Sequence, residues 1–452
     1  MADQHSPRSS ATDLTEGSLF GKMLAFSVPY LIACFLQTFY GLADLFITGL
    51  FHGADAISAV AIGSQVMHML TVVTVGLAVG TTVSISHAVG ARDRKRAEKC
   101  MGNSVTIFFL YSLVVTAVLI FAVDAVASLL QTPPEALPQA KDYLRICFAG
   151  IPFITAYNIS SSVFRGLGDT RRPMYFVAAS GVMNIGLDWL LIGPLHMGAA
   201  GAALATVASQ AASAVMAFVV LRKKQDGVRL RAENLRPEGS AVREILQVGL
   251  PIAFQESLIQ ISFLVITAIA NSRGVEVAAA VGIVEKVICF LFLVPSAMLS
   301  TVSAVTAQNV GAGKHLRGRD ALKTGCAVVF GFGAVVFLLC QLFAPQIVSV
   351  FTAEPGVIRF GAQYLRSYTV DCMIAGIHFC FSGYFSAYGK SGFSFLHNIL
   401  SVLLVRIPGA YFASVWFPET LYPMGLAAPM GSLLSVGICL YLFRRYRGQF
   451  GL

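Results

Sequence analysis

Long apolar runs alternate with short polar segments along the whole chain. A membrane-spanning helix needs about 20 predominantly apolar residues. Twelve stretches meet this requirement: 22–50, 56–88, 102–123, 143–165, 174–193, 198–221, 245–271, 277–309, 322–343, 364–385, 394–416 and 424–443. The second and eighth stretches are longer than a bilayer needs, so these helices should tilt, kink or extend beyond it. The pattern predicts an all-α membrane protein with twelve transmembrane helices.

The composition fits the same environment. Of the 452 residues, 56% are hydrophobic and only 12% are charged, whereas a soluble domain has about 25% charged residues. Such a chain could not cover a water-facing surface, but lipid-facing positions should be apolar. The nine cysteines include no C-x-x-C pair, so we interpret them as small core residues and expect neither disulfides nor a cysteine metal site.

The basic residues indicate topology. The net charge of +9 would suit a nucleic-acid-binding protein, but the basic residues form short clusters between apolar runs. If the N-terminus is cytoplasmic, 25 of the 32 Lys and Arg residues fall on the cytoplasmic side. Inner loops of membrane proteins carry this excess. We therefore predict that both termini are cytoplasmic and that nucleic acid is not a partner.

The two halves of the chain resemble each other. Pro29 in the first span and Pro251 in the seventh are separated by almost the same interval as the Val-Gly-Ala segments at 89–91 and 310–312. Six spans per half is an even number, which predicts two parallel six-helix repeats. The expected parts are a disordered tail (1–18), a first lobe (19–221), a basic cytoplasmic linker (222–243), a second lobe (244–443) and a cytoplasmic tail (444–452).

Acidic residues within the spans are the main candidates for function. An Asp at the centre of a membrane helix costs about 2.5–3.5 kcal/mol on insertion scales, so it usually faces a cavity or a partner. Five positions qualify: Asp44, Asp188, Glu256, Glu285 and Asp371. Intramembrane carboxylates are functional by default.

Four polar residues of the first lobe are expected at similar depth, about 7–14 Å from the outer surface. They are Asp44 in the first span, Asn184 and Asp188 on one face of the fifth, and Thr206 in the sixth. Their oxygens could coordinate Na⁺, or the two carboxylates could share a proton, because close like charges do not readily ionise together. A polar network that only packs the helices together is the alternative.

The second lobe has a different set of acids. By the spacing of the repeat, Asp44 and Asp188 correspond to Ile266 and Gly409, which are not acidic. Glu285 and Asp371 are expected at comparable depth, with Glu256 nearer the middle, which suggests a second ionisable site. Ion pairing with Lys286 and Arg406 is the alternative explanation.

Aromatic and flexible side chains suggest where an apolar substrate could bind. The candidates are Gln37, Tyr40, Phe153, Tyr157, Phe292 and Met298. Packing between helices would explain these positions as well.

Enzymatic signatures are weak. Gly311-Ala312-Gly313-Lys314 lacks the full P-loop spacing, and the histidines, including His378 and His397, form no zinc motif. Gly166-Leu167-Gly168-Asp169 matches the motif of intramembrane aspartyl proteases, but Asp169 continues into a basic loop. We therefore expect no enzyme activity and no cofactor, with an ion gradient as the energy source.

With these residues in view, the chain resembles the multidrug and toxic compound extrusion (MATE) family from about residue 20 to 445. The first span, 29–44, looks like the family's P…LQ..Y...D opening. Segments 89–91 and 308–313 look like its paired G-A loops, and 164–170 and 184–188 are similar to the ends of its fourth and fifth spans.

This resemblance implies a V-shaped pair of lobes, alternating access, and drug export driven by inward H⁺ or Na⁺. Asp44, Asn184, Asp188 and Thr206 match the first-lobe cation site of the branch resembling the DNA-damage-inducible F proteins. In another branch a glutamate of the seventh span serves the second lobe, and Glu256 is about one turn displaced from that position.

The sequence therefore predicts a secondary transporter that exports cationic amphipathic small molecules by antiport with H⁺ or Na⁺. We expect a monomer in the bacterial inner membrane, with lipid and small-molecule drugs or toxins as its partners. A lipid-linked precursor flippase of the same superfamily is the alternative, although the surplus of intramembrane acids argues against it. A channel is less consistent with two lobes whose charges do not match.

Overall fold

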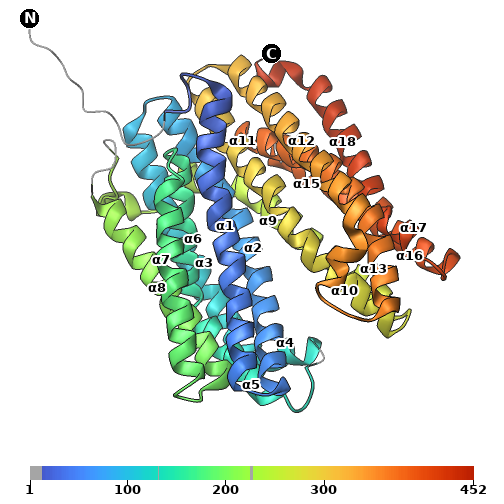
Figure 1. Cartoon of the computed structure of the whole chain (residues 1–452). Coiled ribbons are helices and arrows are strands. Elements are labelled where there is room, and N and C mark those ends of the chain that lie inside the picture. The colour runs from blue at the N-terminus through green and yellow to red at the C-terminus, as the bar shows by residue number, and fades with distance from the viewer. Residues whose placement is uncertain (1–12, 131, 224–227, 452) are drawn as a thin grey trace, which may run out of the picture. The chain divides into compact units, whose positions relative to one another are not determined.

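The computed structural model describes residues 13–130, 132–223 and 228–451. The chain divides into two compact units, unit 1 (Met1–Leu246) and unit 2 (Gln247–Leu452). Both units are built from helices (Figure 1).

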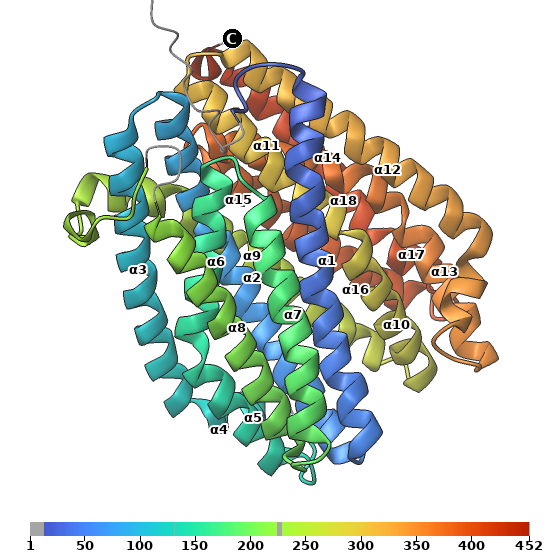
Figure 2. The ribbon, with the colours of Figure 1, turned by 60° about the vertical axis from the view of Figure 1, so that its left-hand side comes forward.

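Unit 1 contains eight α-helices and a short 3₁₀ helix within its described residues. They are α1 (Leu19–Phe51), α2 (Ala54–Gly90), α3 (Arg94–Phe121), α4 (Val123–Leu129), α5 (Leu137–Ala149), α6 (Ile151–Gly166), α7 (Arg171–Ile192), α8 (Gly198–Arg222) and η1 (Ala232–Leu235). Helix α7 packs against both α1 and α8, and the three lie side by side in Figure 2.

The boundary between the units falls within α9 (Gly239–Asn271), so this helix begins inside the predicted linker. The following elements are α10 (Val275–Leu291), α11 (Leu293–Gly311), α12 (His315–Ser349), α13 (Pro355–Tyr368), α14 (Val370–Ala387), α15 (Ser391–Ser401), the π-helix η2 (Val402–Arg406), α16 (Ile407–Trp416), α17 (Tyr422–Gly425), α18 (Ala427–Arg445) and η3 (Arg447–Phe450). Helix α14 is central to unit 2, because it packs against α11, α12, α15 and α18.

The twelve predicted spans are confirmed. Eleven helices are long and apolar enough to cross a membrane, and α5 with α6 makes a twelfth span that is bent by 49°. Pro152 explains this bend, because a proline lacks the N–H that a continuous helix needs and its ring clashes with the carbonyl of the residue four positions earlier. The predicted tenth span (364–385) begins too early, since the chain breaks at Thr369 and the span is Val370–Ala387.

The eighth span also contains a break, between α10 and α11 at Phe292. Pro295 lies four residues after Leu291, where its ring would clash with the Leu291 carbonyl, so α10 ends there. The equally long α2 continues without interruption from Ala54 to Gly90. Of the two stretches that are longer than a bilayer needs, the eighth has Pro295 and is interrupted, whereas the second is continuous.

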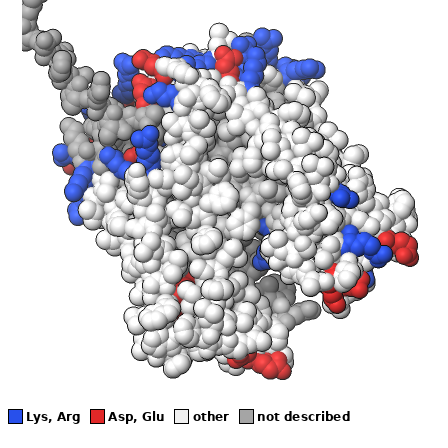
Figure 3. Space-filling model, viewed as in Figure 1, with Lys and Arg blue, Asp and Glu red and all other residues white. Residues whose placement is uncertain are grey.

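Large apolar side chains are exposed on the helices of both units. Phe46, Phe121 and Leu342 are all more than two-thirds exposed, which suits contact with lipid chains. On the face shown in Figure 3 the middle carries almost no charge, and most Lys and Arg side chains gather at the upper end.

The repeat is visible in the backbone. Gly168, after α6, and Gly389, after α14, both have a positive φ, 86° and 69°. Arg92, after α2, and Gly313, after α11, form a second pair with the same spacing along the chain, and their φ values are 57° and 73°. A left-handed residue commonly terminates a helix, so the two halves end corresponding helices in the same way.

Described residues near both chain ends are buried against the rest of the protein. The predicted disordered segment falls mostly on residues 1–12, outside the described residues, while Leu14 is fully buried. At the other end Phe450 is fully buried, its ring stacks on Phe385 and Phe443, and its carbonyl accepts a hydrogen bond of 2.9 Å from the Tyr388 hydroxyl. The aromatic cluster at the end of α14 holds this segment in place.

We predict that Phe450→Ala lowers the free energy of unfolding by about 3–5 kcal/mol, because it empties a closely packed aromatic cluster. Thermal unfolding of the detergent-solubilised protein measures the change. Phe330→Ala, at an exposed position of α12, is the matched control and should unfold near the wild-type temperature. Equal unfolding temperatures for the two variants would show that the segment does not contribute to stability.

Candidate functional site

Three helices of unit 1 bring the four predicted first-lobe residues together. The Thr206 hydroxyl on α8 donates a hydrogen bond of 3.0 Å to Oδ2 of Asp44 on α1. The Asp44 carboxylate also contacts the side chains of Asp188 and Asn184 on α7. Asn184 and Asp188 are one turn apart, so both reach the same neighbour. The structure thus brings these four residues into one cluster.

The site is enclosed by protein. Asp44 is 2% exposed, and Asn184 and Asp188 are fully buried. Asp44 lies seven residues before the end of α1 at Phe51, which is about 10 Å along the helix axis. The carboxylates therefore lie well inside the span rather than at the loop.

Several polar atoms of this site are buried without a hydrogen-bond partner: Oδ1 of Asp44, both carboxylate oxygens of Asp188 and both amide atoms of Asn184. Within the described residues, neither aspartate forms an ion pair with a Lys or Arg. Unpaired buried charges are costly. The site therefore has unused acceptor capacity that a bound cation or proton would satisfy.

The donor set limits which ion would bind. Carboxylate, amide and hydroxyl oxygens suit hard cations, whereas transition metals prefer sites with imidazole or thiolate. Throughout the described part of the chain, no group of three or more His, Cys, Asp or Glu side chains is arranged to hold a metal ion. The chemistry of the oxygens fits Na⁺, and the contact between two carboxylates fits a shared proton.

A polar and aromatic region lies next to the carboxylates. Gln210 on α8 donates a hydrogen bond of 2.5 Å to the hydroxyl of Tyr40, which is one turn from Asp44 on α1. Tyr157 on α6 is buried in the same apolar cluster as Tyr40. Sequence reasoning missed Gln210, although its position one turn after Thr206 places it on the same face of α8.

The other cavity candidates are dispersed. Gln37, on the turn of α1 before Tyr40, is half-buried, while Phe153 is 46% exposed on α6. In unit 2, Phe292 makes edge contacts with the rings of Tyr368 and Phe379, and Met298 is buried. Of the six predicted residues, the structure brings only Tyr40 and Tyr157 into one described cluster.

The three candidate acids of unit 2 have separate environments. Glu285 accepts a bifurcated hydrogen bond from the Thr267 hydroxyl, with distances of 3.1 and 3.2 Å. Asp371 is 1% exposed, and both its oxygens lack a hydrogen-bond partner. Glu256 accepts a bond of 3.4 Å from its neighbour Gln255.

Arg406 links two of these acids electrostatically. It lies on the π-helix η2, where it donates to the Tyr368 hydroxyl at 2.5 Å and stacks over the ring of Phe263. Its charge acts on both Glu285 and Asp371, but within the described residues it forms no direct ion pair with either. Lys286 is exposed. The structure therefore shows neither of the close ion pairs considered from the sequence.

Sequence reasoning did not foresee that two histidines lie together. His378 on α14 and His397 on α15 are buried, and their ring centroids are 5.4 Å apart. They lie on different helices and are well separated in the chain. No short motif could have paired them.

The protease-like motif has a structural role. Oδ1 of Asp169 accepts hydrogen bonds from the backbone N–H groups of Arg171 (3.0 Å) and Arg172 (3.2 Å) at the start of α7. Its other oxygen pairs with the Arg172 side chain at 3.4 Å. This aspartate caps a helix, as acceptors at helix N-termini do.

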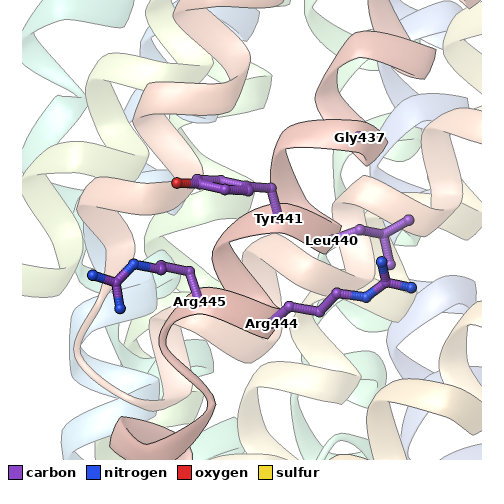
Figure 4. Close-up of a pocket in the computed structure, with 5 residues that line it drawn as sticks. All are labelled: Gly437, Leu440, Tyr441, Arg444 and Arg445. Carbon is purple, nitrogen blue, oxygen red and sulfur yellow. The ribbon is translucent and has the colours of Figure 1, made fainter.

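An open pocket lies on the surface of α18. It is lined by Gly437, Leu440, Tyr441, Arg444 and Arg445, with Tyr441 and Arg445 extending to one side of the helix and Leu440 and Arg444 to the other (Figure 4). None of the predicted site residues lines it. We interpret it as an irregularity of the protein surface near the end of the span.

Comparisons with known proteins agree with the fold and the repeat. The sequence model of the MatE family matches residues 29–190 and 251–412. The two matched segments begin at Pro29 and Pro251, the prolines that first indicated the repeat. The match covers more than half of the chain.

Relatives and solved structures align over nearly the full length. The probable multidrug resistance protein YpnP of Bacillus subtilis (strain 168) is 28% identical over 437 residues, covering 96% of this chain and 97% of the relative. The multidrug export protein MepA of Staphylococcus haemolyticus (strain JCSC1435) is 26% identical, covering 83% of each chain.

Among solved structures, a MOP superfamily transporter from Pyrococcus furiosus Vc1 (DSM3638) gives a TM-score of 0.92 at 22% identity, covering 98% of this chain and 99% of that one. A MATE structure in the straight conformation gives 0.91 at 23% identity, covering 98% of this chain and all of that one. These similarities establish the fold.

We predict that Thr206→Val lowers the free energy of unfolding by about 1.5–3 kcal/mol, because it removes a hydrogen bond to a charged group at nearly constant volume. Thr206→Ser keeps the hydroxyl and should retain most of that stability. Thermal unfolding of the purified protein compares the two. If both variants unfold together with the wild type, the bond to Asp44 contributes nothing to stability.

Proposed function

Because the chain belongs to the MatE family, whose members are transporters and not enzymes, we propose that it exports cationic amphipathic small molecules by antiport with H⁺ or Na⁺. Two relatives carry names that describe multidrug resistance or multidrug export. The observation that carries the proposal is the buried, unpaired Asp44–Asp188 contact in unit 1.

Coupling follows from the electrostatics of this contact. Without a bound cation, two carboxylates on α1 and α7 face each other and repel. Binding of H⁺ or Na⁺ removes that repulsion and favours closer approach of the two helices. Pro29 interrupts the hydrogen bonding of α1, and sharp bends occur at prolines, so α1 can respond by bending.

Transport requires that ion and substrate prefer different conformations. In the outward-open state the ion binds at Asp44 and Asp188, the α1 helix rearranges, and the substrate leaves outward. In the inward-open state the ion is released and a new substrate enters. The ion gradient then drives export, because each cycle returns one ion-loaded protein to the inside.

The proposed substrate class follows from the same residues. A cation is attracted by the unpaired carboxylates, and the ring of Tyr40 offers a surface for cation–π contact. We propose Gln37, Tyr40, Tyr157 and Gln210 as the substrate-facing region of unit 1. Phe153 contributes only if it turns inward, and Phe292 with Met298 would form a corresponding region in unit 2.

For the topology, we propose that the basic ends of the helices face the cytoplasm of a bacterial inner membrane, following the positive-inside rule. Both termini would then be cytoplasmic. We propose a monomer as the transporting species. We propose that the domain boundaries predicted from the sequence apply, with the second lobe beginning near the start of α9 along the chain.

Transport of an anionic lipid-linked precursor is a second candidate. The observation that favours it is Arg165 on α6, which is 5% exposed and donates to Ser161 (3.0 Å) and Ser162 (2.6 Å). Its guanidinium stacks over Tyr30, and it has no carboxylate partner among the described residues. A buried cation of this kind could hold an anionic group.

We predict that Asp44→Asn reduces gradient-driven transport by roughly tenfold or more, since it removes one charge of the proposed coupling pair. Proteoliposomes loaded with ethidium report dye movement under an imposed pH gradient and then under a Na⁺ gradient. Asp142→Asn, which changes an exposed acid on α5, is the matched control and should transport at the wild-type rate.

Three other outcomes would change the interpretation. Full activity of Asp44→Asn would move coupling to Glu256, Glu285 and Asp371. Dye movement by the wild type that is independent of any gradient would indicate a channel. Absence of dye movement under either gradient would contradict the drug antiporter and favour the flippase.

A further inference from the structure

Helix α14 is an unusual membrane span. Among the candidate spans of the described chain it has the lowest mean hydropathy, 1.2, and the largest buried share, 72%. Its polar residues include Asp371, His378 and Ser382, which follow one another by seven and then four positions. This spacing places all three on the same face of the helix. The span therefore carries a polar stripe directed into unit 2.

Neighbouring helices complete the stripe. Nε2 of His378 lies 3.3 Å from the hydroxyl of Ser432 on α18, and Nε2 of His397 on α15 lies 3.0 Å from the hydroxyl of Ser382. The two imidazole rings meet edge to face. Each ring thus has one nitrogen bound to a serine and also packs against the other histidine.

Ser432 also connects this pair to the carboxylate. Its hydroxyl lies beside Asp371 as well as beside His378. The contacts form a continuous series: Asp371, Ser432, His378, His397 and Ser382. From Asp371 to Ser382 the stripe covers eleven residues of α14, which is about 16 Å along the helix.

A polar network that served only to pack the helices would have its hydrogen-bonding groups paired, and several groups of the stripe are not paired. Nδ1 of both histidines and both oxygens of Asp371 are buried without hydrogen-bond partners. Whichever tautomer each neutral ring adopts, one of its nitrogens leaves a donor or an acceptor unused. A buried group of this kind costs about 1–3 kcal/mol, which apolar side chains of similar size would avoid.

Few charged or titratable groups face the stripe. Arg406 on η2 acts on Asp371 and His378, and Glu285 on α10 is a neighbour of Arg406. Tyr368 at the end of α13 and Cys372 on α14 face Asp371. The titratable group that acts on His397 is His378. Along the inner part of the stripe, within the described residues, the two imidazoles and the serine hydroxyls are groups that can both accept and donate a proton.

We propose that His378 and His397, together with the hydroxyls of Ser432 and Ser382, form a proton-transfer path between Asp371 and the inner half of unit 2. An imidazole can accept a proton on one nitrogen and release one from the other, and a serine hydroxyl can rotate between donor and acceptor roles. Each transfer leaves the ring in its other tautomer and the hydroxyl reversed, so the ring must flip and the hydroxyl must rotate back before the next proton passes. The path predicts that the ion that moves through unit 2 is H⁺, because imidazole nitrogen is a poor ligand for Na⁺.

This proposal rests on the proposed antiport and on the proposed topology. Asp371 lies near the start of α14, on the side where the loops carry few basic residues, and Ser382 lies toward the basic end. A proton that binds Asp371 from outside must reach the cytoplasm, and the stripe leads in that direction. The neighbouring π-helix is consistent with a functional segment, since such distortions are frequent at functional sites.

The test compares His378→Gln, His397→Gln and Ser432→Ala with wild type. Glutamine keeps a hydrogen-bonding group but cannot transfer a proton in this way. His52→Gln is the matched control, because His52 also bonds through Nε2, to the Ile192 carbonyl at 3.0 Å in unit 1. Proteoliposomes containing a trapped pH-sensitive dye report proton flux when an ethidium gradient is imposed. Ethidium fluorescence gives the flux of the substrate, and thermal unfolding checks that each variant folds.

A transfer path controls how fast protons move, not how many move per substrate. We expect both histidine variants to slow proton flux by roughly tenfold or more, with an unchanged ratio of H⁺ to ethidium and a wild-type rate for His52→Gln. Ser432→Ala should slow the flux too, and it tests the path if a histidine variant fails to fold. Wild-type rates in all three variants, or an altered ratio, would overturn the path.

The same experiment distinguishes a failure of the proposed antiport from a failure of the proton-transfer path. If wild-type protein shows no exchange of ethidium for either ion, the antiport itself is contradicted. If wild-type protein exchanges ethidium for Na⁺ without proton flux, the antiport stands and the proton path is overturned.

Discussion

A lipid bilayer cannot satisfy a polar group, and this constraint shapes the whole molecule. Each span must complete its backbone hydrogen bonds internally, so the chain crosses the membrane as helices. Where a proline prevents this, as at Pro152 and Pro295, the span bends or breaks at a place surrounded by other helices. Polar side chains are confined by the same rule to helix faces that meet inside a unit. The carboxylates of α1 and α7 and the stripe of α14 are enclosed for this reason.

The fold was largely predictable because apolar length is a local property of the sequence. The twelve spans and the repeat follow from runs of residues and from spacings such as Pro29 to Pro251. The cluster around Asp44 was also predictable, since helix geometry gives the depth of each residue. The break at Thr369 was missed because hydropathy does not register a change in helix direction between α13 and α14.

Other features depend on which helix faces pack against each other. Local patterns in a single sequence do not reveal such contacts between distant helices. The contacts of Gln210 with Tyr40 and of His378 with His397 join residues on different helices. The burial of Phe450 was missed because a short aromatic segment after a basic helix end looks like a solvated tail. Its partners include Tyr384 and Phe385, which lie far earlier in the chain, at the end of α14.

The left-handed residues that end corresponding helices indicate how the chain evolved. Gly168 with Gly389, and Arg92 with Gly313, share a backbone conformation at one common interval along the chain, whereas Asp44 and Asp188 have no acidic counterparts at that interval in unit 2. Duplication of an ancestral six-helix gene would explain the shared backbone, and later divergence the unlike interiors. The helix ends were then retained as inherited architecture, while each copy acquired its ionisable chemistry separately.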